Sequence, residues 1–392
     1  MIKAWLKQFD AAREINSRLK ARQAVSRYRR TVAHYSALDE APISDAWRAR
    51  AQVLSRSPKG RDLRIFFVGT DEQQDKSGFL QALERLGDVR CFVREDGSWG
   101  QNDPAPYQQR RERNTLRLEQ LFADNASEGW VPQLLIAQTW GCLIEPACFS
   151  RLRDRYGVFV VNIAMDDRHQ YWGSKVAGMW DGTYPLIPHI DLTLTAAPEA
   201  VGWYRKEGGV ALYFPEASDP EIFHPMPDLP KIHDVSFVGV RYGIRERIVN
   251  ALRQAGVSVS AYGTGWEGGR IANENVPKLF AQSKIVLGVG TIGHCDDFFA
   301  LKLRDFDAPM SGSCYLTHDN SDLHHLYDVG TEIATYTCVD DCVEKARSML
   351  SDKVRINLIG EAARRRACRD HSWDRRLSDL LSSLETLSGI QG

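Results

Sequence analysis

The sequence predicts an α/β protein with two successive parallel-sheet domains that face a cleft. Short apolar runs alternate with segments of helical spacing, which is the pattern of βαβ units. The alternation stops at residues 215–230, a stretch that holds five prolines and no periodicity, and then begins again. The length of 392 residues also suits two hydrophobic cores better than one. We therefore predict one domain on each side of the proline-rich link.

The first domain is predicted to span residues 61–229. Its first strand is the apolar run LRIFFVG, at residues 63–69, and the following helix, at residues 79–87, ends at a glycine. Further apolar runs predict strands, and further helices are expected at residues 111–122 and between residues 139 and 157. The strands are expected at residues 89–93, 133–139, 157–164, 191–196 and 210–215.

The second domain is predicted to span residues 230–370, where the same alternation of strands and helices resumes. Its strands are expected at residues 234–239, 257–263, 284–290, 313–317 and 332–336. A last helix begins near Ser372, and we expect residues 371–392 to pack back on the first domain.

Residues 1–60 are predicted to form a basic helical extension. Within residues 1–35 the apolar positions are spaced by three, four or seven residues in two clusters, and basic side chains fill much of the remainder. These apolar positions are Trp5, Phe9, Val25, Tyr28, Val32 and Tyr35. Such a helix can lie on an anionic membrane surface or pack on the body of the protein. The interrupted apolar stripe favours packing, and peripheral contact with the inner membrane surface stays the alternative.

The composition excludes several classes of protein. Fifty basic side chains almost balance fifty-one acidic ones, so the net charge of -1 gives no reason to expect a nucleic-acid partner. The sequence shows neither a signal peptide nor a run long enough to span a bilayer, which predicts a cytoplasmic protein. The eight cysteines lack metal-site spacing and are expected to be reduced thiols.

No Walker A loop, GxGxxG, GxSxG or HExxH motif occurs, which argues against a kinase-like NTPase, a typical dehydrogenase and an α/β-hydrolase. Three glycine-containing loops in the second half are more informative. In FVGVRYGIRER, Gly239 and Arg241 lie between a strand and a helix, where backbone N–H groups and a guanidinium can bind phosphate. AYGTGW forms a second loop with an aromatic residue suited to a flat base, and a third flexible loop contains Gly290. The residues of AYGTGW taken as candidates are Tyr262, Gly263, Gly265 and Trp266.

The strongest local signal is KLRDFDAPMSGSCYLT, which leads from a helix into a strand. Asp307, with Gly312 following it, is placed to accept the hydroxyls of a ribose. Lys302 and Arg304 lie just upstream and can neutralise a diphosphate. The structural alternatives are that both cations are solvated helix residues and that Asp307 is a helix-end charge in an ion pair.

With DVSFVGVRYGIRER and AYGTGW upstream, this stretch resembles the C-terminal domain of the CgeB-like (spore-protein-like) group of bacterial GT-B glycosyltransferases. DLHHLYDVGTEIATY and HSWDRR fit the same pattern. The similarity covers residues 191–381 well and residues 63–167 more weakly, with VVNIAMDD as the best match there, and it leaves residues 1–60 uncovered.

The resemblance implies a GT-B architecture of two Rossmann-like domains and no permanently bound cofactor or metal. It implies that a nucleotide-sugar donor binds to the C-terminal domain, while a glycan, lipid-linked glycan or protein acceptor enters from the N-terminal domain. In related retaining enzymes a glutamate in an EAxxxG stretch binds the ribose, and Asp307 stands at that position here. A second glutamate lies two helical turns earlier in those enzymes, and Phe299 stands there. The departure leaves the stereochemistry open, together with two alternative functions: a non-catalytic scaffold or nucleotide-sugar-binding protein, and a nucleotide-sugar epimerase.

Catalytic candidates come from AMDDRHQYW, which follows a predicted strand of the first domain. Asp166, Asp167 and His169 concentrate titratable groups in this loop, and an inverting transfer needs a base to take the acceptor proton. The alternative is that the aspartates cap the next helix. A second loop at the cleft contains Gly69, Thr70 and Asp71, with the same alternative.

Overall fold

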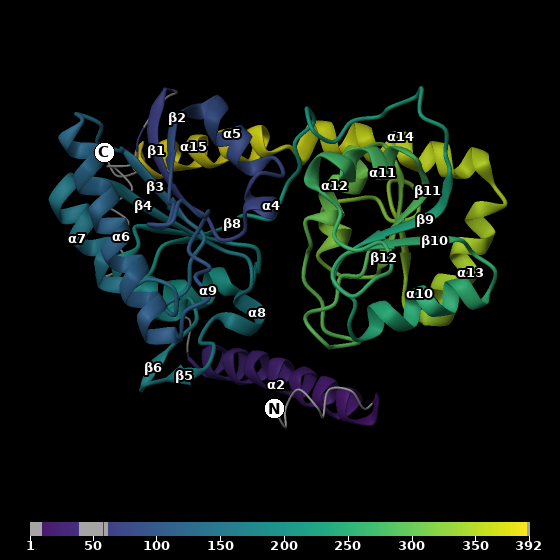
Figure 1. Cartoon of the computed structure of the whole chain (residues 1–392), viewed down its shortest axis with the longest axis horizontal. Helices are drawn as coiled ribbons and strands as arrows, with labels where there is room; N and C mark the ends of the chain where they lie inside the picture. The colour runs from purple at the N-terminus through teal and green to yellow at the C-terminus, as the bar shows by residue number, and fades with distance from the viewer. Residues whose placement is uncertain (1–9, 39–57, 59–61, 390–392) are drawn as a thin grey trace. The chain divides into compact units, whose positions relative to one another are not determined.

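The computed structural model describes residues 10–38, 58 and 62–389. These residues divide into two compact units (Figure 1). The N-terminal unit consists of residues 27–215 together with the chain from Arg376 onward, and the C-terminal unit consists of residues up to 26 together with 216–375. Each unit contains one parallel sheet, so the predicted α/β class with two parallel sheets is confirmed.

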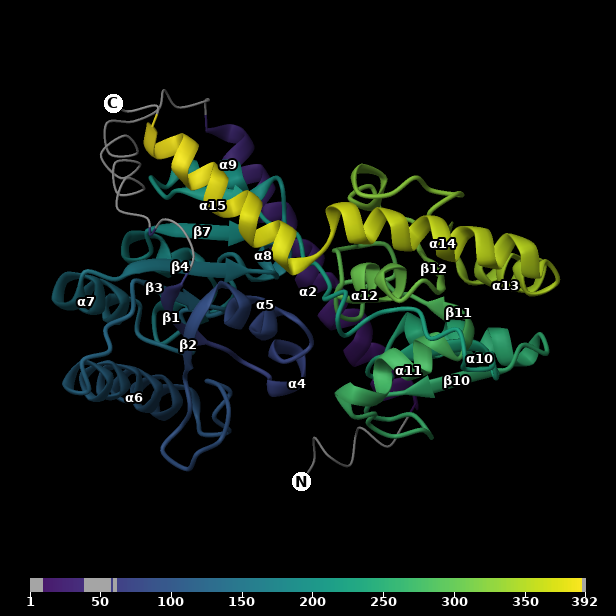
Figure 2. The same cartoon turned by 90° about the horizontal axis from the view of Figure 1, so that it is seen from above.

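The sheet of the N-terminal unit has the strand order β2-β1-β3-β4-β7-β8, and every neighbouring pair is parallel. Figure 2 shows β7, β4, β3, β1 and β2 following one another in this order. All six residues of β4 are buried, as expected for a parallel strand covered on both faces. The strands are β1 (Leu63–Val68), β2 (Gly87–Cys91), β3 (Leu134–Ala137), β4 (Phe159–Ala164), β7 (Leu192–Thr195) and β8 (Ala211–Tyr213).

The helices of this unit connect its strands, and the two long ones, α6 and α7, lie side by side (Figure 1). They are α4 (Glu72–Asp75), α5 (Phe79–Leu86), α6 (Tyr107–Ser127), α7 (Pro146–Tyr156), α8 (Asp167–Gln170), η2 (Tyr184–His189) and α9 (Ala200–Lys206). A small hairpin, β5 (Lys175–Val176) and β6 (Met179–Trp180), projects from the segment after β4. The hairpin and the shortest helices were not predicted, because they are too short to show a hydrophobic period.

The sheet of the C-terminal unit has the order β10-β9-β11-β12-β13, again entirely parallel. Figure 1 shows α10 and α13 on one side of this sheet and α11, α12 and α14 on the other. The strands are β9 (His233–Val238), β10 (Val259–Tyr262), β11 (Ser283–Leu287), β12 (Cys314–His318) and β13 (Ala334–Tyr336). The helices are α10 (Ile244–Gln254), η3 (Asn273–Asn275), α11 (Val276–Ala281), α12 (Arg304–Met310), η4 (Leu323–His325), α13 (Val339–Leu350) and α14 (Lys353–Asp370).

Both sheets reverse their strand order at one point. In the N-terminal unit the reversal lies between β1 and β3, and in the C-terminal unit it lies between β9 and β11. Loops leaving the carboxyl ends of these strands turn to opposite faces, which opens the crevice where α/β proteins bind ligands. The loops that begin at Gly69 and at Gly239 therefore occupy the expected ligand-binding positions of their sheets.

The N-terminal helix α2 (Asp10–Ala37) has its residues from Arg27 onward grouped with the N-terminal unit. Tyr35 is 2% exposed, stacks on Trp203 at 6.0 Å between ring centroids, and donates a 2.7 Å hydrogen bond to Glu207. Tyr28 and Val32 pack against the same aromatic cluster. This part of the apolar stripe is thus covered by protein, while Trp5 and Phe9 lie outside the described residues. Within the described part of the chain, no helix combines the length and hydropathy that a membrane crossing requires.

The C-terminal helix α15 (Trp373–Gly389) is grouped with the N-terminal unit from Arg376 onward. The division between the units falls at residues 215 and 216, at the start of the proline-rich stretch. The predicted boundary at residue 229 lies at the other end of that stretch.

Tyr35 tests how α2 is attached. Replacing it with alanine removes a buried ring and its hydrogen bond to Glu207, and should lower the free energy of unfolding by about 3 kcal/mol. Urea unfolding followed by tryptophan fluorescence would measure the loss. Ser36→Ala, at an exposed neighbouring position, should leave the stability unchanged. Equal stabilities of the two variants would contradict the packing described here.

Candidate functional site

The loop after β9 is tied to the loop after β10. The Gly239 N–H donates to the Tyr262 carbonyl at 2.8 Å, and the Gly239 carbonyl accepts from Trp266 Nε1 at 2.8 Å. Gly263 has a φ of +124°, and a Cβ there would lie 2.3 Å from the Gly239 oxygen. Only glycine permits this approach at residue 263, so Gly263 holds the two loops together.

Trp266 does not offer the predicted surface for a nucleotide base. Its side chain is 5% exposed and packs edge-on against Phe237, with the Arg241 guanidinium 5.3 Å from its ring centroid. Tyr262, half-buried at the end of β10, packs against the neighbouring core cluster. The prediction for Trp266 is wrong because its indole is buried in the core and its Nε1 bonds the second loop to the first.

Arg241 is exposed and pairs with Glu246, and its guanidinium also contacts the carbonyl of Gly265 at 3.4 Å. Its charge is therefore partly neutralised within the protein. Gly265, with a φ of +93°, lets the second loop pass close to the Arg241 side chain. The residues predicted in these two loops do come together, but their polar groups largely bond to one another.

Arg245, which the sequence analysis missed, is the more informative cation. It lies in the first turn of α10, on the same helix face as the fully buried Val249 and Leu252, and burial lowers its pKa. Its guanidinium lies 4.4 Å from the Tyr242 ring centroid and donates to the Val240 carbonyl at 3.3 Å.

Within the described part of the chain, the buried Nε of Arg245 has no hydrogen-bond partner and no carboxylate pairs with this side chain. Arg304 is near enough to lower the pKa of Arg245 further. The buried Nε of Arg304 likewise lacks a partner among the described residues. Arg245, with an unused donor beside the N-terminus of α10, favours an anion, and Arg304, which also pairs with Asp307, adds a second guanidinium nearby. The signal available in the sequence was a basic residue on the apolar face of a helix.

Asp307 is not available to a ribose in this structure. Its side chain is fully buried and accepts hydrogen bonds from Ser218 Oγ at 2.8 Å and from Arg304 Nη1 at 2.7 Å. Burial raises the pKa of Asp307 to about 7, although Arg304 acts in the opposite direction. The predicted ribose contact is corrected accordingly, and the ion pair weighed as an alternative is what the structure contains.

The remaining donor candidates have backbone roles. Lys302 donates its N–H to the buried Asp305 at 2.6 Å, at the start of α12, while its own side chain is half-exposed. Gly312 has a φ of +72° and ends α12. The Gly290 carbonyl accepts from the Ala300 N–H at 3.0 Å and holds the third loop.

Beside that loop, the structure reveals a buried histidine that the sequence analysis did not consider. His318 ends β12, is 1% exposed, and has its pKa lowered to about 4 by desolvation. Its ring lies 5.5 Å from the ring of Phe299. Among described residues, His318 Nε2, Thr291 Oγ1 and Asn320 Nδ2 are buried without a hydrogen-bond partner. These unused polar atoms lie beyond the carboxyl ends of β11 and β12, where a ligand is expected.

In the N-terminal unit, the polar groups of the loop after β1 form hydrogen bonds within the loop and with the helix that follows it. Asp71 caps α4 by accepting from the N–H groups of Gln73 and Gln74 at 3.0 and 3.1 Å. Thr70 donates its N–H to the buried Asp75, and a Cβ on Gly69 would lie 2.1 Å from that carboxylate. The capping alternative therefore describes Asp71 correctly.

Asp167 is excluded as the base that takes a proton from the acceptor. It is 1% exposed and accepts hydrogen bonds from the hydroxyls of Thr183, Thr195 and Tyr204 at 2.6–3.1 Å. Burial raises its pKa to about 6. The correction follows from position: Asp167 turns into the core and anchors α8, whereas its neighbour Asp166 keeps a side chain that is 40% exposed.

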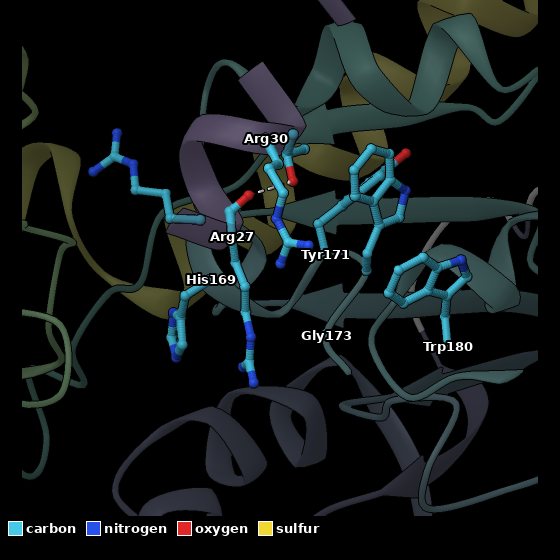
Figure 3. Close-up of a pocket in the computed structure, with 9 residues that line it drawn as sticks. Arg27, Arg30, His169, Tyr171, Gly173 and Trp180 are labelled. Atoms are coloured by element: carbon cyan, nitrogen blue, oxygen red, sulfur yellow. Dashed lines mark hydrogen bonds between the residues drawn. The ribbon is translucent and has the colours of Figure 1, made fainter. Parts of the chain in front are cut away.

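His169 lies 4.0 Å from Asp166 and lines an open depression in the N-terminal unit, which we call the Arg27 depression (Figure 3). Its empty space, part of it continuous with solvent, is about 250 Å³. The depression is formed by α2 and by the segment from α8 to β6. Its lining residues are Arg27, Arg30, Thr31, Arg168, His169, Tyr171, Trp172, Gly173 and Trp180.

No group of three His, Cys, Asp or Glu side chains that could hold a metal ion occurs within the described residues.

Comparison with known proteins gives the C-terminal part of the chain a family resemblance. A family model described as "Glycosyl transferase-like" matches residues 245–382, from Arg245 in the first turn of α10 into α15. No curated protein sequence matches the chain. The glycosyltransferase part of the resemblance in the sequence is thereby supported, and the CgeB-like subgroup stays a prediction.

Several solved structures share the architecture. Sucrose-phosphate synthase from Thermosynechococcus elongatus is 11% identical, with a TM-score of 0.58 over 84% of this chain and 100% of that one. HepE of Anabaena, solved in complex with UDP and glucose, is 13% identical, with a TM-score of 0.55 over 82% and 100%. AviGT4, a glycosyltransferase involved in avilamycin A biosynthesis, is 15% identical, with a TM-score of 0.53 over 83% and 98%. At these identities the likeness establishes the fold, which is GT-B with two Rossmann-like domains.

The role of Asp167 has a measurable consequence. Because burial raises its pKa above that of an unfolded aspartate, ionisation costs more in the folded state, and stability falls as the pH rises through about 6. Asp167→Asn removes this pH-dependent contribution to the free energy of unfolding. Relative to the parent chain, the variant should gain about 1–2 kcal/mol between about pH 5 and pH 8 in denaturant titrations. Asp154→Asn, at a side chain that is 72% exposed, is the control and should show no such gain. A pH-independent difference for Asp167→Asn would contradict the assignment.

Proposed function

We propose that this protein is a glycosyltransferase that uses a nucleotide-sugar donor, with the donor diphosphate bound at the start of α10 in the C-terminal unit. The observation that carries the proposal is Arg245, a half-buried arginine whose buried Nε has no hydrogen-bond partner and which has no carboxylate partner among the described residues, at the point where the strand order of the second sheet reverses. Partial desolvation of a cation without a counter-ion is unfavourable, and a bound diphosphate would supply the missing charge.

The chemistry of sugar transfer fits this arrangement. The bond from the sugar to the diphosphate breaks through an oxocarbenium-like state, and negative charge grows on the leaving phosphates. Fixed guanidinium groups and backbone N–H groups that already point at this position lower the barrier, because they need no reorganisation when the charge appears. In the proposal Arg245 and Arg304 provide that charge, and the mechanism therefore includes no metal ion.

The identity of the nucleotide is approached through the shared fold. HepE was solved with UDP and with UDP-glucose, and it shares the GT-B architecture with this chain. A uridine nucleotide is accordingly the first donor to test. The unpartnered polar atoms of His318 and Asn320, at and just beyond the end of β12, are candidates for contacts to the sugar or the nucleoside.

The proposed acceptor is a glycan, free, lipid-linked or attached to protein, bound by the N-terminal unit. Asp166 and His169 remain the candidates for the base, since both keep partly exposed side chains while Asp167 is buried. They lie 4.0 Å apart, so a carboxylate could orient the imidazole as it accepts the proton of the acceptor hydroxyl.

One observation favours a second candidate. Phe299 stands where related retaining enzymes carry a glutamate, and its ring lies beside the buried, uncharged His318. A protein that binds a nucleotide sugar without transferring it would also fit. Release of UDP from UDP-glucose, followed by mass spectrometry, separates the two: a transferase shows acceptor-dependent or slow hydrolytic release, and a binding protein shows none.

Arg245→Gln tests the donor site. Loss of a charge-assisted contact to the diphosphate should raise the Kd for UDP at least about tenfold, measured by calorimetry across a panel of nucleoside diphosphates. Arg245→Lys keeps the charge but not the planar fork, so its Kd for UDP should lie between those of the parent chain and Arg245→Gln.

Arg247→Gln, at an exposed side chain on the same helix, is the matched control and should bind as the parent chain does. Melting curves establish that each variant is folded. Unchanged UDP affinity in folded Arg245→Gln, or no binding of any nucleotide by the parent chain, would refute the proposed donor site.

A further inference from the structure

We propose that the Arg27 depression binds an acidic sugar, one that carries a phosphate or a carboxylate, and that this sugar is the acceptor terminus. The role as acceptor rests on the function proposed above, while the binding itself does not. The site is assembled entirely within the N-terminal unit, from the end of α2 and from the segment that follows β4 (Figure 3).

The charge of the depression selects an anion. Three arginines and a histidine line it, and no carboxylate is among the lining residues. Arg168 is paired with Glu199 through two bonds of 2.8 and 3.2 Å, so its charge is largely compensated. Arg27 has a neutral partner instead: it donates to the hydroxyl of Ser174 at 2.7 Å. Lys175, whose Nζ lies over the ring of Trp180 at 4.9 Å from its centroid, adds a further cation next to a lining residue.

Arg27 is the expected anchor for the acidic group. Its side chain is half-buried, and the hydrogen bond to Ser174 uses only one end of the guanidinium. The planar fork of an arginine matches the oxygens of phosphate and carboxylate, which gives both strength and orientation. Partial burial strengthens the interaction further, because solvent screens the two charges less.

The aromatic part of the lining selects a sugar. Trp172 and Trp180 stack at 5.8 Å between ring centroids with 22° between their planes, and both are partly exposed. Such flat, rigid surfaces bury the apolar face of a pyranose ring at little entropic cost.

The same features argue against an anionic membrane as the occupant. The apolar residues of this part of α2, Tyr28, Val32 and Tyr35, pack against the protein and are not displayed for insertion into lipid. A surface that holds arginines and tryptophans in a depression, rather than on an exposed ridge, favours a small ligand that enters it.

The position of the depression suits an acceptor. His169 is one of its lining residues, and Asp166 lies 4.0 Å from His169. A sugar anchored at Arg27 and stacked on Trp180 would thus have its hydroxyls within the same depression as the proposed base. The acidic group would fix which hydroxyl faces that base.

The test is calorimetric binding of glucose 6-phosphate, glucuronate, inorganic phosphate and glucose to the full chain without any nucleotide. The two acidic sugars should bind more tightly than glucose. Arg27→Gln should raise their Kd at least about tenfold, and Arg27→Lys should raise it less. Trp180→Ala should weaken binding of glucose 6-phosphate while leaving the affinity for inorganic phosphate unchanged. A preference between the two acids would distinguish phosphate from carboxylate as the recognised group.

Arg29→Gln is the matched control, since Arg29 is exposed on the same helix and does not line the depression. Equal affinity for glucose and the acidic sugars, or equal effects of Arg27→Gln and Arg29→Gln, would overturn the proposal. UDP affinity, measured in the same variants, should stay unchanged because its proposed site lies in the other unit. If the parent chain binds the acidic sugars but does not bind UDP, the proposed donor site is refuted while the proposed sugar site at the Arg27 depression is supported.

Discussion

The parallel pairing of the strands within each of the two sheets is the constraint on which the remaining structure depends. Because every strand in a sheet points the same way, all the loops that leave the carboxyl ends gather at one edge. The reversals of strand order, between β1 and β3 and between β9 and β11, then separate adjacent loops and create room for a ligand. The chain places Gly69 and Gly239 at these two points. At Gly69 a Cβ would lie 2.1 Å from the Asp75 carboxylate, so a glycine lets this loop pack against that side chain.

Buried carboxylates hold these loops in place. Asp75 and Asp167 in the N-terminal unit, and Asp305 and Asp307 in the C-terminal unit, are almost fully buried, and desolvation raises the pKa of each. Each is bonded to N–H or O–H groups from other parts of the same unit, which ties a strand end to its surroundings. Breaking such a set of bonds leaves a buried acceptor without partners and is therefore strongly unfavourable. The loops consequently owe their shape to polar contacts that are invisible in a hydrophobic pattern.

This explains what the sequence could and could not predict. Long apolar runs such as β1 and β4 were predicted, because a strand buried on both faces leaves a continuous signal. Acidic residues after strands were also found, but their roles were misassigned: whether Asp167 faces solvent or core depends on Thr183, Thr195 and Tyr204, which lie far along the chain. The Arg27 depression could not be predicted for the same reason, because its two segments are brought together only by folding. For Arg245 a signal did exist, since a cation on the buried face of a helix contradicts amphipathic patterning.

The carboxylates and the arginines of both units differ in how fully the protein itself supplies their hydrogen-bond partners. Carboxylates near the strand ends are saturated by the protein's own donors, as Asp167 is by three hydroxyls and Asp307 by Ser218 and Arg304. Some arginines lack such saturation among the described residues: Arg245, for example, has a buried Nε without a partner, and Arg27 has only a serine hydroxyl. Desolvating a cation without a counter-charge reduces stability, and such a site persists where a ligand supplies the charge. The partner-deficient cations, rather than the acidic residues, therefore mark where anionic substrates would bind.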